Sequence, residues 1–422
     1  MVGTAIRATP DAPRAAAFHN GADRLGVALF HSGSRDLPGL GANLRDQVRR
    51  GLPRPPSQLA WDFLSIAMSI FAADRFVLRS ASEDGWTRVI SVDVAVQNPV
   101  IWEPHRERLA AAFRFLTGDI WHLSFSPDGD EAPAFPPQLT DRDCICLFSG
   151  GLDSLLGAIK LQAEGRTPLL VSQGSPKEIS PQVSLSEAIG LSQHRFEGRV
   201  SEKWRAPYEG STRGRSLIFF AYGALAASAL GLGEVIVPEN GFIAINPPLT
   251  RRRLGSLSTR TTHPHLLKEL SEILDAVGIH VRLHNIFEGK TKGEMLAECD
   301  HPQLGLLASG SYSCGKGKRL NKQCGRCIPC LIRRASFHAS GVPDMTERGY
   351  AARLDRSKDN DDVLSALLAG ARRGHLDPAA VERWVAAAGP LPSDPLRRAT
   401  IIGTVDRGLA EVSAFLETVR WR

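Results

Sequence analysis

Residues 141–161 read D-R-D-C-I-C-L-F-S-G-G-L-D-S-L-L-G-A-I-K-L, and this stretch decides the fold. Residues 144–148 form an apolar run that predicts a short buried strand, and residues 153–164 show the apolar spacing of an amphipathic helix. Two adjacent glycines between them allow a tight turn and the close approach of a ligand. Free N–H groups at the start of the helix point to the same place. The stretch therefore predicts a strand–loop–helix unit that binds phosphate.

Six consecutive residues form the predicted phosphate loop: Ser149, Gly150, Gly151, Leu152, Asp153 and Ser154. The two serines add hydroxyl donors, and Asp153 can cap the first helical turn or help to hold a metal–phosphate group. An ordinary strand-to-helix turn is the alternative interpretation, since glycine-rich turns are common. The loop is not a Walker A motif, because no Gly-Lys-Ser/Thr follows, and no G-x-G-x-x-G lies on a strand–helix junction here.

The composition is that of a globular protein with two or three domains, at 422 residues, 43% hydrophobic and 23% charged. The 51 basic and 45 acidic side chains give a net charge of +6, which fits a nucleotide or nucleic-acid partner without requiring one. We interpret the apolar stretch 217–233 as a buried helix rather than a membrane span, because a strand-like segment follows at once. No secretory signal opens the chain, and we expect a cytoplasmic protein.

Strands and helices alternate from residue 141 onwards. Such alternation predicts a doubly wound α/β domain with a parallel sheet, whose ligands bind beyond the carboxyl ends of the strands. The phosphate loop lies at such a position. The predicted strands are 144–148, 169–172, 235–237 and 279–283, and the predicted helices are 153–164, 215–232 and 266–277.

The flanking regions have weaker patterns, and we expect three parts in all. These are an N-terminal α+β accessory domain at 1–138, the α/β domain with a cysteine knuckle at 139–340, and a C-terminal helical segment at 341–422. Residues 1–55 show weak periodicity, so parts of this region are expected to be loosely ordered. Before residue 138 we predict strands at 76–79, 87–96 and 121–125, a helix through 109–116 and a linker at 127–137; the C-terminal helices are predicted at 363–371, 379–388 and 401–419.

Four of the seven cysteines are clustered: Cys314, Cys324, Cys327 and Cys330 follow the spacing C-x9-C-x2-C-x2-C. Four thiolates make a closed tetrahedral zinc site of the structural kind. An iron–sulfur cluster is the alternative, because the same ligands suit it. The odd number of cysteines and their tight grouping favour metal binding in a reducing compartment over a disulfide framework.

The S-G-G-L-D-S string at 149–154 resembles the PP-loop of the N-type ATP pyrophosphatases, which cleave ATP to AMP and pyrophosphate. Together with the cysteine cluster at 314–330, it resembles the QueC family of 7-cyano-7-deazaguanine synthases. The sequence around the cysteines is similar to the QueC pattern: S-C at 313–314, C-G-R-C-I-P-C at 324–330, Arg333, and A-S-F at 335–337. The resemblance covers about residues 141–340.

Two further segments match this family. Gly214-Arg215-Ser216 resembles its G-R-N segment, with Ser in place of Asn, and Lys292 with Glu294 resembles its K-x-E motif. The resemblance implies an ATP-dependent ligase that adenylates a 7-carboxy-7-deazaguanine-type acid, with ATP, Mg²⁺ and Zn²⁺ as cofactors. It also implies that Asp153, Arg215 and Lys292 are catalytic. Without it, Arg215 is a plain surface arginine and Lys292 a solvated helix start.

The chain departs from QueC, which is shorter, outside 141–340 and in one segment within that range. The segments D-G-W at 84–86, L-T-G-D-I-W at 116–121 and S-T-R-T-T-H-P-H at 258–265, with the helical tail, are similar to QueC-like proteins of bacterial anti-phage operons, in particular the QatC proteins of the Qat system. This resemblance implies a partner protein from the same defence operon as the amine acceptor. We expect neither a membrane nor a nucleic acid as a partner, and a homodimer stays open.

Other interpretations remain at this point. The chain can be a stand-alone synthase that uses ammonia, a tRNA-modifying PP-loop enzyme, or a non-catalytic nucleotide-binding assembly module. The 258–265 segment fits a substrate loop or a capped turn before the next helix. Within it, His263 is either a base toward the amine or a structural residue. Residues 251–253, three arginines, fit a solvated loop or a nucleic-acid contact.

Overall fold

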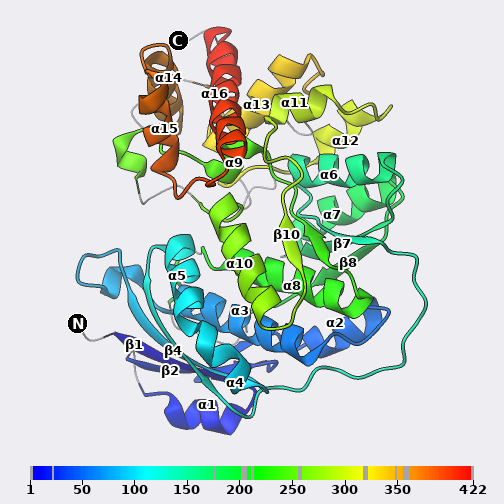
Figure 1. Ribbon diagram of the computed structural model, residues 1–422, viewed down its shortest axis with the longest axis vertical. Helices are drawn as coiled ribbons and strands as arrows, with labels where there is room; N and C mark the ends of the chain where they lie inside the picture. The colour runs from blue at the N-terminus through cyan, green and yellow to red at the C-terminus, as the bar shows by residue number, and fades with distance from the viewer. Residues whose placement is uncertain are drawn as a thin grey trace.

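Two five-stranded parallel sheets form the framework of the computed structural model (Figure 1). The structure describes residues 3–20, 23–174, 176–200, 207–210, 213–254, 259–316, 322–346, 349–354 and 361–419. In both sheets the central strand comes first in the sequence, and the chain then winds outward on both sides. The strand orders are β3-β2-β1-β4-β5 and β10-β9-β6-β7-β8.

The first sheet comprises β1 (Thr4–Thr9), β2 (Arg24–Leu29), β3 (Gly39–Leu40), β4 (Val89–Ala95) and β5 (Ile120–Ser126). Its pairings are all parallel, a more regular arrangement than the α+β region expected from the sequence. The accompanying helices are α1 (Ala12–Phe18), α2 (Leu44–Gly51), α3 (Gln58–Phe76), α4 (Pro99–Trp102) and α5 (Arg106–Thr117), with 3₁₀ turns at Arg79–Ala81 and Glu103–His105.

Two expectations for this region were wrong. The described part of 1–55 is not loosely ordered, because the strands β1, β2 and β3 and the helices α1 and α2 lie within it. The predicted strand at 76–79 does not form either. Its β-favouring residues follow a helix that is apolar nearly all round, so α3 continues to Phe76 and a 3₁₀ turn begins at Arg79. The helix through 109–116 and the strands at 87–96 and 121–125 are confirmed.

The second sheet confirms the doubly wound α/β prediction. Its strands are β6 (Cys144–Leu147), β7 (Pro168–Gln173), β8 (Gln193–Phe196), β9 (Glu234–Ile236) and β10 (Arg282–His284), all parallel. The predicted strand at 279–283 starts later, because Ile279 and Val281 lie in the turn after the preceding helix. The helices are α6 (Leu152–Ala163), α7 (Pro176–Ala188), α8 (Arg215–Leu230), α9 (Gly241–Ile245) and α10 (Pro264–Ala276), with a 3₁₀ turn at Arg251–Arg253.

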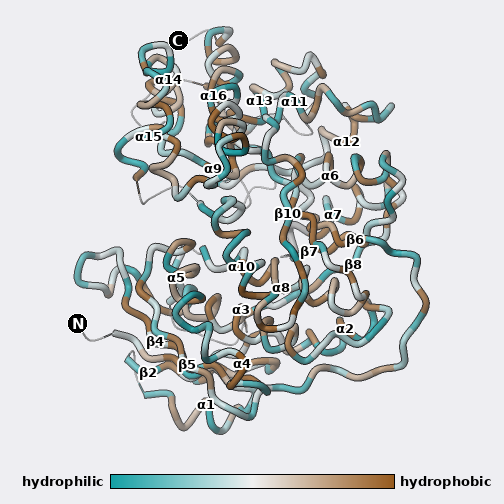
Figure 2. The backbone as a smooth tube through the Cα atoms, in the orientation of Figure 1, coloured by the Kyte–Doolittle hydropathy of each residue, from teal (hydrophilic) through white to brown (hydrophobic). Residues whose placement is uncertain are grey.

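Helices α3 and α8 join the two sheets. α3 packs on β2 and β4 and against α8, and α8 packs in turn on β6 and β7. A helix that is hydrophobic all round belongs in an interior, and both helices are buried along most of their length. One hydrophobic core accordingly joins the two sheets, since it contains Val92 of β4, Phe63 of α3, Phe220 of α8 and Val171 of β7. Figure 2 shows hydrophobic stretches along β4, β5 and β6 on either side of this layer.

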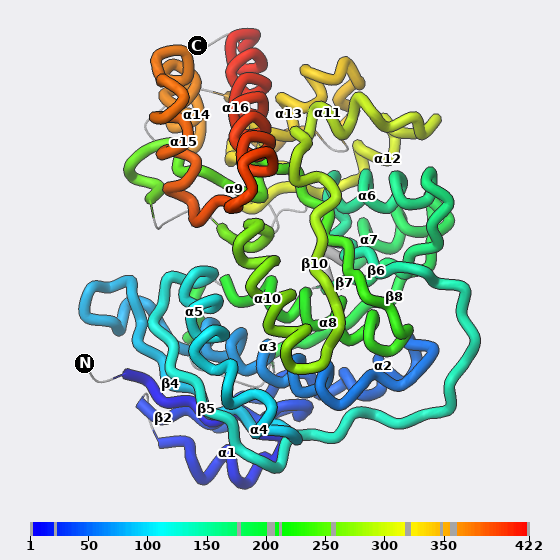
Figure 3. Tube along the Cα trace, in the orientation of Figure 1, coloured from blue at the N-terminus to red at the C-terminus, as the bar shows by residue number. Residues whose placement is uncertain are grey.

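The connection between β5 and β6 runs around the outside of the molecule from the first sheet to the second (Figure 3). Residues 127–143 contain no helix or strand, in agreement with the linker predicted at 127–137. The boundary at 138 stays a prediction, since the shared core extends across it.

The remaining helices gather at the end of the molecule opposite the first sheet (Figure 1). Helix α16 packs on α9, α11, α13, α14 and α15, and these contacts surround a separate core. The three predicted C-terminal helices are thus confirmed. Among the described residues, none of the helices has both the length and the apolar composition that crossing a bilayer requires. The bounds are α11 Lys292–Ala297, α12 Leu304–Gly310, α13 Ile328–Ser340, α14 Asp361–Arg373, α15 Pro378–Ala386 and α16 Pro395–Glu417.

Candidate active site

A cavity of about 630 Å³ lies at the carboxyl end of the second sheet. β6 lies between β9 and β7, so the chain reverses its winding direction beside β6, which is where open α/β sheets bind ligands. All six residues of the predicted phosphate loop line this cavity, and so do Arg215 and Lys292. The structure therefore brings together segments that lie far apart in the sequence.

The phosphate loop needs glycine at its second position. Gly150 has φ +76°, in the left-handed region, and a Cβ there would lie 2.9 Å from Cγ of Gln182. Gly151 donates its N–H to Oγ of Ser149 at 3.2 Å, and the Ser149 and Ser154 hydroxyl oxygens are 3.2 Å apart. Backbone amides and hydroxyls thus gather at the N-terminus of α6, which is an arrangement suited to an anion.

Asp153 forms a buried ion pair with Lys292. The Lys292 Nζ lies 3.1 Å from Oδ2 of Asp153, and the Lys292 side chain is only 3% exposed. Asn240 donates its side-chain N–H to the same oxygen at 3.0 Å. Burial is the strongest single influence and raises the pKa of Asp153, but the charge of Lys292 and the hydrogen bonds with Glu239, Lys292 and Asn240 together outweigh it and lower that pKa. Asp153 is therefore an ionised carboxylate on the cavity wall.

Glu239 is a cavity residue that the sequence analysis missed. It closely follows β9, at the carboxyl end of the strand beside β6, and this position was the available signal. Burial, together with the nearby charge of Asp153, raises the pKa of Glu239 well above its ordinary value. Two carboxylates at one site repel each other unless a proton or a cation lies between them.

Mg²⁺ fits this pair. Hard cations prefer oxygen ligands, and Mg²⁺ is commonly bound through one or two carboxylates together with substrate phosphates. Oδ1 of Asp153 is buried and has no hydrogen-bond partner among the described residues, so one carboxylate oxygen remains for a cation. Asp153 and Glu239 are the residues that would hold the ion.

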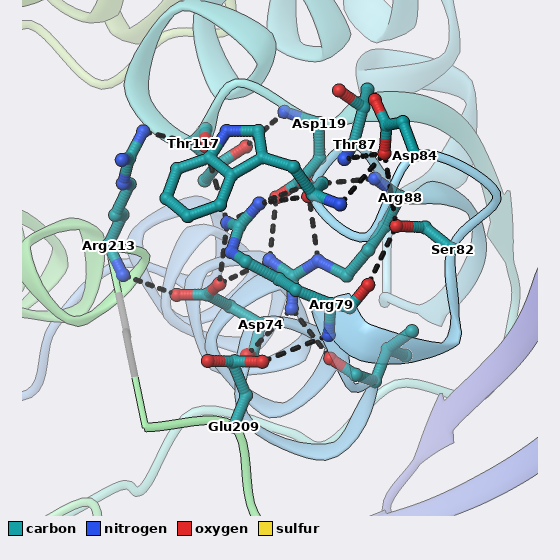
Figure 4. A network of polar contacts seen from close by, with 12 residues as sticks. Asp74, Arg79, Ser82, Asp84, Thr87, Arg88, Thr117, Asp119, Glu209 and Arg213 are labelled. Carbon is teal, nitrogen blue, oxygen red and sulfur yellow. Dashed lines mark hydrogen bonds and ion pairs between the residues drawn. The ribbon is translucent and has the colours of Figure 1, made fainter. Parts of the chain in front are cut away.

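Two arginines line the cavity at the start of α8. Arg215 is the first residue of the helix, and Arg213, which the sequence analysis did not single out, precedes it. Asp74 fixes their backbone, because its Oδ2 accepts the N–H groups of Arg213 and Gly214, both at 2.6 Å. The Arg213 guanidinium lies over the ring of Trp86 and donates to the carbonyl of Thr117 at 3.2 Å (Figure 4). The first half of the chain thus positions one wall of the site.

The four predicted zinc ligands come together. Their Sγ atoms all lie within 4.8 Å of one another, and the pairs Cys314–Cys327 and Cys324–Cys330 are each separated by 3.8 Å. A tetrahedron with zinc–sulfur bonds of about 2.3 Å has edges of roughly 3.8 Å, so the cluster fits a single zinc ion. The thiolates around a four-iron cluster bind different iron atoms and would lie further apart. The geometry favours zinc.

This cysteine knuckle contacts the phosphate loop. Tyr312 donates its N–H to the carbonyl of Gly150 at 2.9 Å, and the Leu152 N–H donates to Oγ of Ser313 at 3.3 Å. Arg333 is fully buried and donates to the Ala308 carbonyl at 2.6 Å, which joins α13 to α12. Residues 312–313, just before the first cysteine of the cluster, therefore hold the phosphate loop through two hydrogen bonds.

The described residues of the 258–265 segment have two different roles. Ser258 lies outside the described residues. Thr259 and Thr261 line the cavity. His263 is buried, caps α10 by accepting the N–H of His265, and does not line the cavity, so its structural interpretation is favoured over a base. Of the three arginines at 251–253, Arg253 is also structural, since it is buried and paired with Asp362.

Comparisons with known proteins bear on half of the chain. No protein-family model matches it. The 7-cyano-7-deazaguanine synthase of Cupriavidus necator is 27% identical over 50% of this chain and 99% of its own length. The synthase of Cupriavidus taiwanensis is 28% identical over 51% of this chain and 100% of its own length. The synthase of Myxococcus xanthus is 24% identical over 49% of the chain and 96% of its own length. The chain is therefore QueC-like over about half of its length.

Proposed function

We propose that the chain is an ATP-dependent enzyme that adenylates a 7-carboxy-7-deazaguanine-type acid and transfers the acyl group to an amine. One observation carries this proposal. The phosphate loop, the Asp153–Lys292 pair, Glu239 and two arginines line a single cavity of about 630 Å³. That volume is within the ~300–1,000 Å³ range of small-molecule sites. The similarity to 7-cyano-7-deazaguanine synthases supports the choice of substrate class.

In the first step, a carboxylate oxygen of the acid attacks the α-phosphorus of ATP. The bond from that phosphorus to the oxygen bridging to the β-phosphorus breaks, and pyrophosphate leaves. Backbone amides of the loop at 149–154 bind the β- and γ-phosphates and stabilise the developing charge. Arg215 and Lys292 contribute cationic contacts. Asp153 and Glu239 would hold Mg²⁺, which would supply further neutralisation of phosphate charge when bound.

In the second step, the amine nitrogen attacks the acyl carbon, the bond to the AMP oxygen breaks, and the nitrogen loses a proton. A carboxylate accepts an amine only after its oxygen has become a good leaving group, here AMP. The cysteine cluster has a structural part in this scheme, because the adjoining residues 312–313 bind the phosphate loop and four thiolates would leave no open coordination position on zinc.

We further propose that the amine belongs to a partner protein encoded in the same anti-phage operon, in the cytoplasm. Free ammonia needs no docking surface, whereas a protein acceptor does. Half of this chain has no counterpart in the synthases that it resembles, although it covers nearly their whole length. The QatC-type segments at 84–86, 116–121 and 258–265 and the helical tail support the defence role.

The test is mass spectrometry of candidate partner proteins after incubation with the enzyme, ATP and 7-carboxy-7-deazaguanine. A gain on one partner by the mass of the acyl group is expected, and Asp153→Ala should prevent it. Unmodified partners, with nitrile formed rapidly from ammonium alone, would refute the protein acceptor. That outcome would favour the second candidate, a stand-alone synthase, which the similarity to 7-cyano-7-deazaguanine synthases supports.

A further inference from the structure

The C-terminal helix α16 contacts the segment that carries Lys292. Lys292 is the first residue of α11, and Thr291 before it caps the helix, with Glu294 completing a capping box. The helix α11 is short, at 6 residues, so its own hydrogen bonds fix it weakly. What holds Lys292 in place must therefore come from neighbouring elements.

Glu411 of α16 binds both sides of Lys292 in the sequence. One oxygen, Oε1, accepts a hydrogen bond from the Thr291 hydroxyl, and the other, Oε2, accepts the Gly293 N–H at 3.3 Å. The Gly293 amide is one of the first-turn donors that a short helix leaves unsatisfied, and a carboxylate is the preferred acceptor there. Glu411 thus supplies the acceptor from a different part of the chain.

Two ion pairs of α16 reinforce this contact. Arg407 donates to Oε1 of Glu294, and it also donates to the Gly289 carbonyl at 3.1 Å. Arg397 forms a bidentate pair with Glu288, with both distances at 2.7 Å. Together these pairs bind the loop before α11 and the third residue of α11 to one face of α16.

The surfaces also fit closely. A Cβ on Gly293 would lie 2.6 Å from Oε1 of Glu411, and a Cβ on Gly241 would lie 2.1 Å from the carbonyl oxygen of Glu288. On α16, a Cβ on Gly408 would lie 2.8 Å from the Phe242 side chain. The packing of α16, α9 and the segment around α11 therefore leaves no room for a side chain at these three glycines.

We propose that Glu411 is a positioning residue for Lys292: by binding Thr291 and Gly293, it fixes the first turn of α11 so that Lys292 reaches Asp153. This inference rests on the proposed function, in which Lys292 stabilises charge during ATP cleavage. Displacement of a catalytic group by about 1 Å can cost about 10²-fold in rate, so a residue that touches no substrate can still control activity. The C-terminal segment is then a part of the active site.

The experiment uses the full-length protein and measures pyrophosphate release from ATP with 7-carboxy-7-deazaguanine. Glu411→Ala is expected to lower kcat by ~10- to 100-fold, with a smaller effect on the KM for ATP, because the phosphate loop is unchanged. Glu411→Gln keeps the reach and one accepting oxygen but presents an NH2 donor in place of the other oxygen, so it should recover only part of the loss. Glu411→Asp keeps the charge but is one carbon shorter, and it replaces Glu411→Ala in this measurement if that variant does not fold.

Asp406→Ala is the matched control. Asp406 lies on the same helix and pairs with Arg373 of α14 through both oxygens, each at 2.7 Å, rather than with α11. It should keep kcat within about 2-fold, as expected for an interaction remote from the reacting groups. In the Lys292→Ala background, Glu411→Ala should have no further effect, because both changes act through one side chain.

Three results would contradict the inference. They are a Glu411→Ala enzyme that matches Asp406→Ala, a Glu411→Asp enzyme with wild-type kcat, or an equal loss from Glu411→Ala with and without Lys292. In each case an active wild type leaves the proposed function standing. A wild type that releases no pyrophosphate would instead refute the proposed function, and the inference with it.

Discussion

At the scale of single residues, the phosphate loop was the part of the site that the sequence could reveal. Ser149 to Ser154 are contiguous, so their pattern is visible without a fold. Glu239 and Arg213 were missed because their significance depends on where β9 ends and where α8 begins relative to the loop. Lys292 and Arg215 were found through the resemblance to a family, and the structure places both on the same cavity.

Gly150→Ala tests the requirement for a left-handed residue in the loop. The substitution should lower the free energy of unfolding by ~1–2 kcal/mol and abolish most ATP cleavage, because the new Cβ meets Gln182. Gly165→Ala is the matched control, with φ +75° and nothing within 4 Å of its Cβ. Gly165→Ala should lower the free energy of unfolding by a similar amount in a denaturant titration and should keep its ATP-cleavage activity. Equal activities of the two variants would contradict the role assigned to Gly150.

At the scale of elements, the strongly periodic helices and four of the five strands of the second sheet were predictable, whereas β8 and α3 were not. The apolar residues of α3 lie all around the helix, so they mark no single buried face. The helix is buried all round because it packs on β2 and β4 of the first sheet and also against α8, which covers the second sheet. The region 1–55 was misjudged for a related reason. β1 and β2 have 6 residues each, but β2 is buried continuously from Leu25 to Leu29 and β3 is only Gly39–Leu40, so no clear alternation marks these strands.

The cap of α10 predicts a pH dependence of stability. Burial lowers the pKa of His263 to about 3, with the charges of His265 and Arg260 acting in the same direction. The folded state therefore disfavours the protonated ring, and the stability present above the unfolded pKa of about 6.5 is lost as the pH falls toward the folded value. His263→Asn keeps a capping side chain without this titration. Denaturant titrations at pH 8 and pH 5 should show a smaller acid loss for this variant than for the wild type.

The exposed His122→Asn is the control for that comparison, and its acid loss should match the wild type. An acid loss in His263→Asn as large as that of the wild type would show that protonation of His263 does not oppose folding.

The cysteine knuckle predicts a link between metal content and nucleotide binding. Cys324→Ala should reduce bound zinc, measured by elemental analysis, and should weaken ATP binding, because residues 312–313 of the knuckle hold the phosphate loop. Cys299→Ala, outside the cluster, should change neither quantity. Tight ATP binding by a zinc-free Cys324→Ala protein would contradict this link.

At the scale of the whole molecule, the two sheets share one core and one buried network of charges. Arg79 and Arg88 bind Asp119, and Arg88 also pairs with Asp74 at 2.6 Å, while Asp74 holds the start of α8 (Figure 4). No local pattern in the sequence could predict this network, because its members come from separate segments that meet only in the folded chain. It explains why the first half of the chain bears on a site in the second.

Arg88→Ala tests this connection. Removal of Arg88 leaves two buried carboxylates, Asp74 and Asp119, with only Arg79 to compensate them, so the free energy of unfolding should fall by ~3–5 kcal/mol, with both halves unfolding in one transition. Arg14→Ala, which breaks the exposed pair with Asp128, should cost only ~0–1 kcal/mol. Two separate transitions, or equal costs for the two variants, would contradict a shared core.

The most direct test of the central claim follows a carboxylate oxygen. The acid is supplied with ¹⁸O in its carboxylate, together with ATP and the amine acceptor, and the AMP produced is examined by mass spectrometry. If the loop near residue 150 holds ATP for attack by the acid, each AMP carries one ¹⁸O, and Asp153→Asn yields almost none of it. Formation of ADP, or of AMP without the label, would contradict the account.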